Sequence, residues 1–224
     1  MRTLALALSI AFASTAVAAE KTSARLDDAA ALIGEIMGTP DRSIPQDLFD
    51  RAQCIVVVPG MKKGAFGIGL KYGKGFVSCR NQGAPGWGAP GSVRIEGGSF
   101  GFQIGGSSTD VILLVMNERG MKRLLTSKFT LGGDASVAGG PVGRSASAQT
   151  DAMLTAEILS WSRSRGAFAG VSLEGATLRN DLDENENLYG RKMDNKEVLT
   201  GGKAVPAIAR KFISALNKYS MKKG

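Results

Sequence analysis

The sequence contains no histidine among its 224 residues. Histidine is the commonest general base at neutral pH and the commonest metal ligand in proteins. Its absence excludes Ser-His-Asp and Cys-His catalysis, together with every zinc site that needs a histidine. The two cysteines, Cys54 and Cys79, are too few for a four-cysteine zinc site within one chain. We therefore expect no bound metal, no cofactor and no histidine-based enzyme.

Aromatic residues are scarce as well, at 6% of the chain, and they are not interleaved with the basic residues. That distribution argues against a nucleic-acid partner. Acidic residues number 20 against 28 Lys and Arg, which gives a formal net charge of +8. A basic balance of this kind favours anionic partners, such as lipid head groups or acidic glycans. The acidic residues are scattered, and their spacing pairs no two of them for general acid–base catalysis.

The N-terminus has the features of a cleavable secretory signal peptide. Arg2 supplies a positive start, Leu4–Phe12 is apolar, and small residues follow. Cleavage would fall after Ala18 or Ala19, and it would remove one Arg and no acid, so that the net charge becomes +7. The apolar run is too short to span ~30 Å of hydrocarbon comfortably, which favours cleavage over a retained membrane anchor.

We therefore expect residues 1–19 to be a signal peptide and residues 20–224 to form a single domain. The mature protein would work outside the cytoplasm, in the periplasm or beyond. In an oxidising compartment Cys54 and Cys79 would form a disulfide that closes a loop of about 26 residues and contributes roughly 3–4 kcal/mol. The alternative is two buried thiols, because both cysteines adjoin apolar strand patterns. The sequence leaves both open.

Apolar periodicity predicts helices near both ends of the mature chain. Residues 23–37 repeat apolar side chains every three or four positions. A short second helix is predicted from Ser43, where Ser-Ile-Pro-Gln has the form of a capping box. Asn117 is expected to cap a third helix through Thr126. A last helix carries an apolar stripe from Val205 to Tyr219 and basic residues on its other side. That helix would either dock on the sheet or lie in a membrane interface.

Between these helices the apolar period changes from about 3.6 residues to two, which predicts strands. We expect a turn at Gly73-Lys74-Gly75 between two strands of a hairpin, and a solvated acidic turn at Asp181–Asn187. The predicted strands are 54–58, 66–70, 76–80, 93–95, 100–104 and 111–116, with two more within 152–162 and 167–178. Strands grouped in this way, with so many glycines inside them, predict an α+β fold. Its core would be a Gly-rich, strongly curved antiparallel sheet or small barrel, flanked by N- and C-terminal helices.

Basic residues gather in the predicted hairpin. Lys62, Lys63, Lys71 and Lys74 are close in sequence, and the ends of the hairpin would present them together. Each Lys near an anionic membrane adds about 1 kcal/mol, so four would add roughly 4 kcal/mol at best. These four lysines are our candidate lipid-binding residues.

A succession of phrases resembles the SYLF domain family. They are KKGAFGIGLKYGKG (62–75), WGAPGSVRIEGGSFGFQIGGSSTDVILLVMN (87–117), LGGDASVAGGPVGR (131–144), ILSWSRSRGAFAGVSLEG (158–175) and ENLYGR (186–191). Their order makes the resemblance specific, and it extends over roughly residues 27–217. It implies a non-enzymatic module that binds membrane lipids, which in eukaryotic members are phosphoinositides. Some fungal members bind actin filaments, but an exported protein would not meet cytoplasmic actin.

These observations together predict an exported, non-enzymatic protein that binds anionic phospholipid at a membrane surface. A protein- or glycan-binding module of the cell envelope is the alternative, with the Gly-rich loops around 81–91 and 132–143 as its site. A hydrolase built on two carboxylates is a third hypothesis, which would require two acids close together in a pocket.

Overall fold

The computed structural model describes residues 2–39, 43–81, 83–142, 155–164, 167–170 and 173–221. For residues 2–17, 65–69, 99–106, 164 and 167–170 it describes the backbone alone. The helices are α1 (Arg2–Gly38), α2 (Gln46–Arg51), α3 (Glu118–Leu124), α5 (Leu182–Tyr189), α6 (Asn195–Thr200) and α7 (Arg210–Tyr219), with a 3₁₀ turn η1 (Ala207–Ala209) before α7. The strands are β1 (Cys54–Cys79), β2 (Gly91–Val115), β3 (Lys128–Thr130), β4 (Val137–Gly139), β5 (Ile158–Ser164), β6 (Ala167–Gly170) and β7 (Thr177–Asn180).

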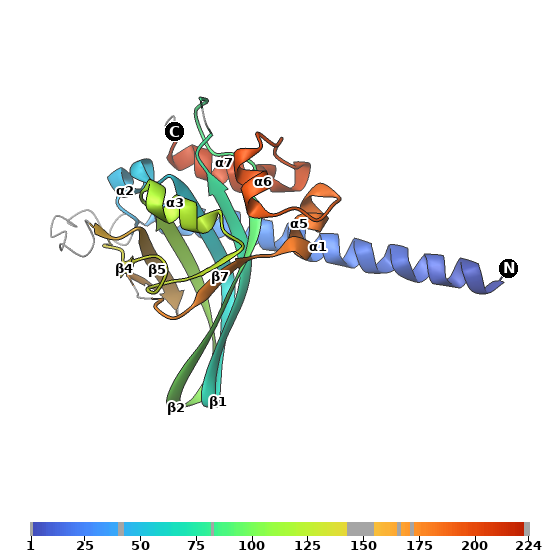
Figure 1. Cartoon of the computed structure of the whole chain (residues 1–224), viewed down its shortest axis with the longest axis horizontal. Coiled ribbons are helices and arrows are strands. Elements are labelled where there is room, and N and C mark those ends of the chain that lie inside the picture. The colour runs from blue at the N-terminus through green and yellow to red at the C-terminus, as the bar shows by residue number, and fades with distance from the viewer. Residues whose placement is uncertain are drawn as a thin grey trace.

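Two long strands, β1 and β2, form an antiparallel ribbon that extends well beyond the rest of the molecule (Figure 1). The register of the ribbon shifts between Phe66 and Ile68, near the middle of β1. At this point β1 folds back on itself, so that its second half returns beside its first half. As a result Cys54 and Cys79, at the two ends of β1, lie with Cα atoms 3.9 Å apart and form a disulfide.

The predicted turn at Gly73-Lys74-Gly75 is wrong, because β1 continues through these residues. The glycines instead allow the two halves of β1 to approach closely. A Cβ atom on Gly75 would lie 2.1 Å from the carbonyl oxygen of Val57, and one on Gly73 would lie 2.7 Å from Cγ1 of Val58. Glycine inside a strand pattern marks a close backbone approach here, and not a reversal of the chain.

The remaining strands extend this ribbon into one curled sheet. Its order is β3-β7-β2-β5-β4, with β1 paired to β2 and β6 paired to β5. All pairs are antiparallel except β4–β5. The predicted strands within 152–162 and 167–178 correspond to β5, β6 and β7, although residues 151–154, 165–166 and 171–172 lie outside the described part. The α+β fold with a strongly curved, largely antiparallel sheet and flanking helices is confirmed.

The sheet buries both of its faces, each in a separate apolar core. Side chains such as Val56, Val58 and Leu113 point to the inside of the curl, where they meet Leu124 and Phe129. The alternate residues of the same strands, among them Ile55, Val57, Ile112 and Leu114, point to the other side and pack with the helices. Burial on both faces explains why Cys54–Val58 and Val111–Val115 are continuous apolar runs.

Helix α1 contains the predicted segment 23–37 but begins much earlier, at Arg2. Leu26, Ala29, Ile33 and Ile36 are buried, as their spacing predicted. Among the α1 side chains that the structure describes, from Ala18 onward, burial starts at Thr22, and the helix before this point extends away from the body (Figure 1). The docked part of α1 is therefore residues 22–36.

Helix α2 begins at Gln46 and is preceded by Pro45, so the predicted start at Ser43 is wrong. A residue that precedes proline disfavours the helical region, which keeps Ile44 out of the helix. Helix α3 begins as predicted: the side chain of Asn117 accepts a hydrogen bond from the backbone N–H of Gly120 at 3.0 Å.

The acidic segment Asp181–Asn187 is not a solvated turn, and this prediction is also wrong. It forms most of α5, whose N-cap Asp181 accepts a hydrogen bond from the backbone N–H of Glu184. Asp181, Glu184 and Asn185 are all buried. Their partners come from distant parts of the chain, which local composition does not reveal.

Helix α7 is docked within the fold, but it packs mainly on α1 and not, as the first alternative had it, on the sheet. Its side chains Phe212, Ile213 and Leu216 are buried in the helix-facing core. Phe212 also lies against Phe76 of β1, with ring centroids 6.1 Å apart. The apolar stripe is thus occupied within the fold, although Ile208 at its start remains 39% exposed.

Candidate functional site

The far part of the β1–β2 ribbon, residues 62–72 of β1 and 97–108 of β2, is here called the arm. Three of the four predicted lysines lie on it. Lys62 is exposed, with its Nζ atom 3.5 Å from Oγ of Ser108 on the paired strand. Lys63 and Lys71 lie on opposite halves of the folded β1. The pKa of Lys63 is lowered, first by partial burial and then by the charge of Lys71, so these two ammonium groups are neighbours.

The arm also exposes two large side chains with apolar surface. The side chain of Leu70 is 66% exposed and that of Tyr72 is 45% exposed. Because alternate residues of a strand face opposite sides, Leu70 and Tyr72 share one face while Lys71 points to the other. Side chains of this size are seldom so exposed, and a tyrosine with an apolar ring and a polar tip is suited to a boundary between water and an apolar phase.

The fourth predicted lysine, Lys74, belongs to a different cluster at the base of the arm. Its Nζ atom lies 2.8 Å from Oδ2 of Asp181 and 3.2 Å from Oε2 of Glu184. Partial burial by itself would lower the pKa of Lys74, but the hydrogen bonds and charges of Asp181 and Glu184 outweigh it and raise this pKa. The charge of Lys74 is therefore neutralised inside the protein, away from Lys62, Lys63 and Lys71.

Glu184 also fixes the start of the docked part of α1. Its Oε1 atom accepts a hydrogen bond from the hydroxyl of Thr22 at 2.7 Å and forms an ion pair with Arg25. The cluster of Arg25, Lys74, Asp181 and Glu184 thus holds α1, β1 and α5 together with two charges of each sign. Sequence reasoning missed both acids, although Asp181 three residues before Glu184 has the spacing of an N-cap.

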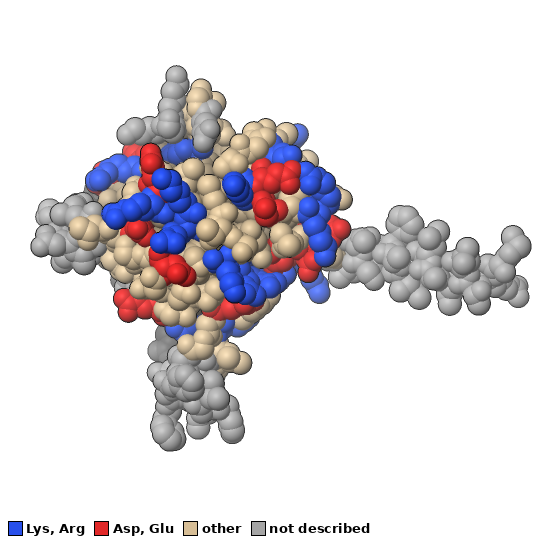
Figure 2. All heavy atoms as spheres, viewed as in Figure 1, with Lys and Arg blue, Asp and Glu red and all other residues tan. Residues whose placement is uncertain are grey.

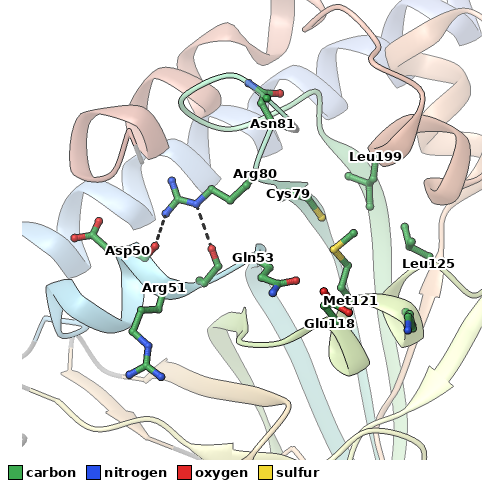
Figure 3. A pocket seen from close by; sticks show the side chains of 13 residues that line it. Asp50, Arg51, Gln53, Cys79, Arg80, Asn81, Glu118, Met121, Leu125 and Leu199 are labelled. Carbon is green, nitrogen blue, oxygen red and sulfur yellow. Dashed lines mark hydrogen bonds between the residues drawn. The ribbon is translucent and has the colours of Figure 1, made fainter. Parts of the chain in front are cut away.

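A pocket of about 810 Å³ lies at the base of the ribbon, where the two ends of β1 meet, between α2, α3 and α6 (Figure 3). One side is apolar and is formed by Cys79, Met121, Leu125 and Leu199. The amide of Gln53 points toward Met121 and Glu118 in the middle of the pocket (Figure 3). No sequence pattern pointed to this pocket, because its residues come from four separate segments.

Arg80, the next residue after the disulfide, forms part of the pocket wall as a structural clamp. Its guanidinium donates hydrogen bonds to the backbone carbonyls of Phe49, Ala52 and Ser220 and lies 3.9 Å from the ring centroid of Trp87. Burial lowers the pKa of Arg80. Although Arg80 lies within the predicted hairpin in sequence, it is remote from the arm lysines.

The loop around residues 81–91, one of the two suggested protein or glycan sites, is anchored to the body at Trp87, while residues 83–85 are exposed. Its Trp87 is only 2% exposed and donates a hydrogen bond from Nε1 to the carbonyl oxygen of Ser220. In the second loop, residues 132–134 are exposed, while residue 143 lies outside the described part. In the described segments, no three cysteine or acidic side chains are grouped so that they could hold a metal ion.

The fold and these surfaces define the class of protein: an α+β domain whose curled sheet carries a long projecting ribbon. Comparison with known proteins then identifies the family. A family model described as "Ysc84: Las17-binding protein actin regulator" matches residues 96–219, which is more than half of the chain. The chain belongs to this family, as its resemblance to SYLF proteins predicted. The matched segment begins after β1, so it does not include the four candidate lysines.

Similar proteins come from animals and fungi. The chain is 32% identical over 185 residues to the SH3 domain-containing YSC84-like protein 1 of Xenopus laevis, covering 82% of this chain and 55% of that protein. It is 34% identical over 177 residues to the SH3 domain-containing protein PJ696.02 of Schizosaccharomyces pombe, covering 78% and 41%. Protein YSC84 of Saccharomyces cerevisiae is 31% identical over 181 residues, covering 79% and 38%. The chain therefore spans about half or less of the length of these relatives.

Proposed function

We propose that this protein is an exported, non-enzymatic membrane-binding protein, and that its arm binds anionic phospholipid. The observation that carries the proposal is the arm itself. There Lys62, Lys63 and Lys71 share a projecting ribbon with the exposed side chains of Leu70 and Tyr72, which lie on the face opposite to Lys71. Cations attract an anionic surface, and adjacent apolar side chains gain free energy when they leave water at that surface.

The expected strength of this contact follows from the number of free charges. Each lysine near an anionic leaflet contributes about 1 kcal/mol, so the three arm lysines contribute about 3 kcal/mol, or roughly a hundredfold in membrane partitioning. Lys74 is left out of this sum because Asp181 and Glu184 already neutralise it. Exposed charges are screened over about 8 Å at physiological ionic strength, so binding of this kind weakens as salt is raised.

The shape of α1 supports the proposal of export. Cleavage after Ala18 or Ala19 would remove the part of the helix that extends from the body and would keep the docked residues 22–36. Thr22, the first buried side chain from residue 18 onward, lies only three or four residues beyond these two positions. N-terminal sequencing of the protein recovered from the cell envelope tests this point. A protein that begins at residue 19 or 20 supports export, and one that retains its first residues in the cytoplasm contradicts it.

Liposome co-sedimentation tests the lipid contact. The protein is mixed with neutral phosphatidylcholine vesicles and with vesicles that contain phosphatidylglycerol, at low and at physiological salt. A variant with Lys62, Lys63 and Lys71 changed to Ala is compared with a matched control in which Arg123, Lys128 and Lys196 are changed to Ala. The control residues are exposed, form no ion pair among the described residues, and change the net charge by the same amount.

We expect the native protein and the control to bind anionic vesicles and the arm variant to lose roughly a hundredfold in partitioning. Equal loss in both variants would mean that net charge alone matters and that the arm is not the site. Binding that does not respond to salt would also contradict an electrostatic contact.

A protein partner is the second candidate, and it rests on the description of the family as an actin regulator. The described relatives are named for SH3 domains or as YSC84 proteins, and none of these names describes an enzyme. Co-sedimentation with actin filaments, run beside the liposome assay, separates the two candidates. Filament binding without vesicle binding would replace the lipid proposal.

A further inference from the structure

The pocket between α2, α3 and α6 is separate from the arm, and its lining has two chemically different sides. Cys79, Met121, Leu125 and Leu199 form the apolar side, with the sulfur atoms of Cys79 and Met121 near its middle (Figure 3). Thioether and disulfide sulfur are polarisable and adapt well to flexible apolar ligands. An apolar wall of this kind is typical of small-molecule sites of about 300–1,000 Å³, and this pocket measures about 810 Å³.

The other side of the pocket is polar, and several of its groups have no partner within the described residues. Gln53 points its amide into the pocket, and neither Gln53 nor Lys122 forms a side-chain hydrogen bond or ion pair within that part of the chain. Arg51 is likewise exposed at the edge of the pocket, with its guanidinium directed away from the apolar side (Figure 3). These groups are available to a ligand.

The charge around the pocket favours an anion. Arg51, Arg80 and Lys122 line it together with Asp50 and Glu118, which leaves one positive charge in excess. Figure 2 shows further Lys and Arg gathered over α3, outside the pocket lining. Asp50 is partly engaged, because it accepts a hydrogen bond from Nε2 of Gln46 at 3.1 Å.

We propose that this pocket binds a single-chain amphiphile with an anionic head group. The acyl chain would lie against Met121, Leu125, Leu199 and the Cys54–Cys79 disulfide, and the head group would face Gln53 and Lys122. Fatty acids and lysophospholipids share this chemistry. The site is independent of the arm, because it lies where the two ends of β1 meet, and it needs no membrane surface.

Binding is measured without membranes, by isothermal titration and by displacement of the fluorescent fatty acid cis-parinarate, below the concentration at which each amphiphile forms micelles. The probes are palmitate, lysophosphatidylglycerol and uncharged monopalmitoylglycerol. Lys122→Glu is compared with Arg123→Glu, its neighbour on α3, which is equally exposed but does not line the pocket. Leu125→Trp, which fills the apolar side, is the second variant, and its native fold is verified by circular dichroism.

We expect one amphiphile per chain, tighter binding of the anionic probes than of monopalmitoylglycerol, and about a tenfold loss in Lys122→Glu with less than a twofold loss in Arg123→Glu. Leu125→Trp should abolish binding of all probes. If palmitate binds and lysophosphatidylglycerol does not, the ligand is a fatty acid; the reverse outcome identifies a lysophospholipid. Equal affinity for the uncharged probe, equal loss in the two charge variants, or unchanged binding in Leu125→Trp would overturn the proposal.

The outcome is distinguishable from that of the lipid-surface experiment. The variant with Lys62, Lys63 and Lys71 changed to Ala should bind palmitate or lysophosphatidylglycerol as the native protein does. The variant Lys122→Glu should still sediment with anionic vesicles. If the same substitutions abolished both amphiphile binding and vesicle sedimentation, the proposal of two separate sites would be contradicted.

Discussion

A methyl group at residue 75 would collide with the backbone of the opposite half of β1. In the native structure a Cβ atom there would lie 2.1 Å from the carbonyl oxygen of Val57 and 2.7 Å from Cα of Val58. Both distances are well short of an ordinary van der Waals contact of about 3.5 Å. The neighbouring atoms belong to backbone that is held by the β1–β2 ladder and by the disulfide, so they cannot rotate away.

Gly75→Ala should therefore lower the free energy of unfolding by about 3 kcal/mol or more, at the upper end of what overpacking costs. Gly64→Ala is the matched control in the same strand. A Cβ atom at Gly64 meets nothing within 4 Å, and Gly64 is exposed. Because alanine loses less backbone entropy than glycine on folding, this control should be neutral or up to about 1 kcal/mol more stable.

Urea unfolding of the oxidised protein, followed by the fluorescence of the buried residues Trp87 and Trp161, measures both variants. A Gly75→Ala protein whose free energy of unfolding lies within about 0.5 kcal/mol of the native value would refute the close approach of the two halves of β1. Failure of Gly75→Ala to fold, with a native-like Gly64→Ala, agrees with the reasoning.

Two further predictions concern the groups that hold the base of the ribbon. Lys74→Met should lower the free energy of unfolding by about 1–3 kcal/mol near pH 7. This is less than the loss of a fully buried ion pair, because Lys74 is partly solvated and Glu184 keeps its pairing with Arg25. The pKa of Lys74 is raised on folding, so its contribution is complete below the ordinary lysine value of 10.5 and declines as pH rises above it. Urea unfolding is measured at pH 9 to 12, a range of about three units around that pKa. The free energy of unfolding should fall more steeply with pH in the native protein than in Lys74→Met, and the same pH dependence in both proteins would contradict this. The unreduced protein should contain no free thiol, and reduction should lower the free energy of unfolding by roughly 3–4 kcal/mol, whereas two titratable thiols would disprove the disulfide.

Much of the fold could be predicted from the sequence, because its strongest signals are periodic. The buried positions of α1 and α7, the cap at Asn117 and the β-branched runs all arise from local patterns of apolar residues. Even the curvature of the sheet was indicated by glycine inside the strands. The roles of individual glycines could not be predicted in this way. By composition Gly73 and Gly75 indicate a turn, and only the folded structure shows that they lie against the opposite half of β1.

In the candidate site, too, local patterns could be predicted and contacts between distant segments could not. Four lysines close in sequence suggested one basic surface, and three of them do lie on the arm. The fourth, Lys74, is neutralised by two acids more than 100 residues later, a pairing that no local pattern encodes. The pocket was missed for a similar reason, since Gln53, Cys79, Met121 and Leu199 become neighbours only after the chain has folded.

The contacts of Glu184 also limit when α1 can finish packing during synthesis of the chain. Thr22 and its hydrogen-bond partner Glu184 are 162 positions apart, and Phe212 and Leu216 of α7, which pack with α1, follow later still. Contacts of such long range form slowly, because the intervening chain must first be brought into place. During synthesis, residues 22–36 therefore lack the part of their docking surface that α5 and α7 supply until nearly the whole sequence has emerged. In the export that we propose, this delay is the period in which an export apparatus would recognise the N-terminal segment.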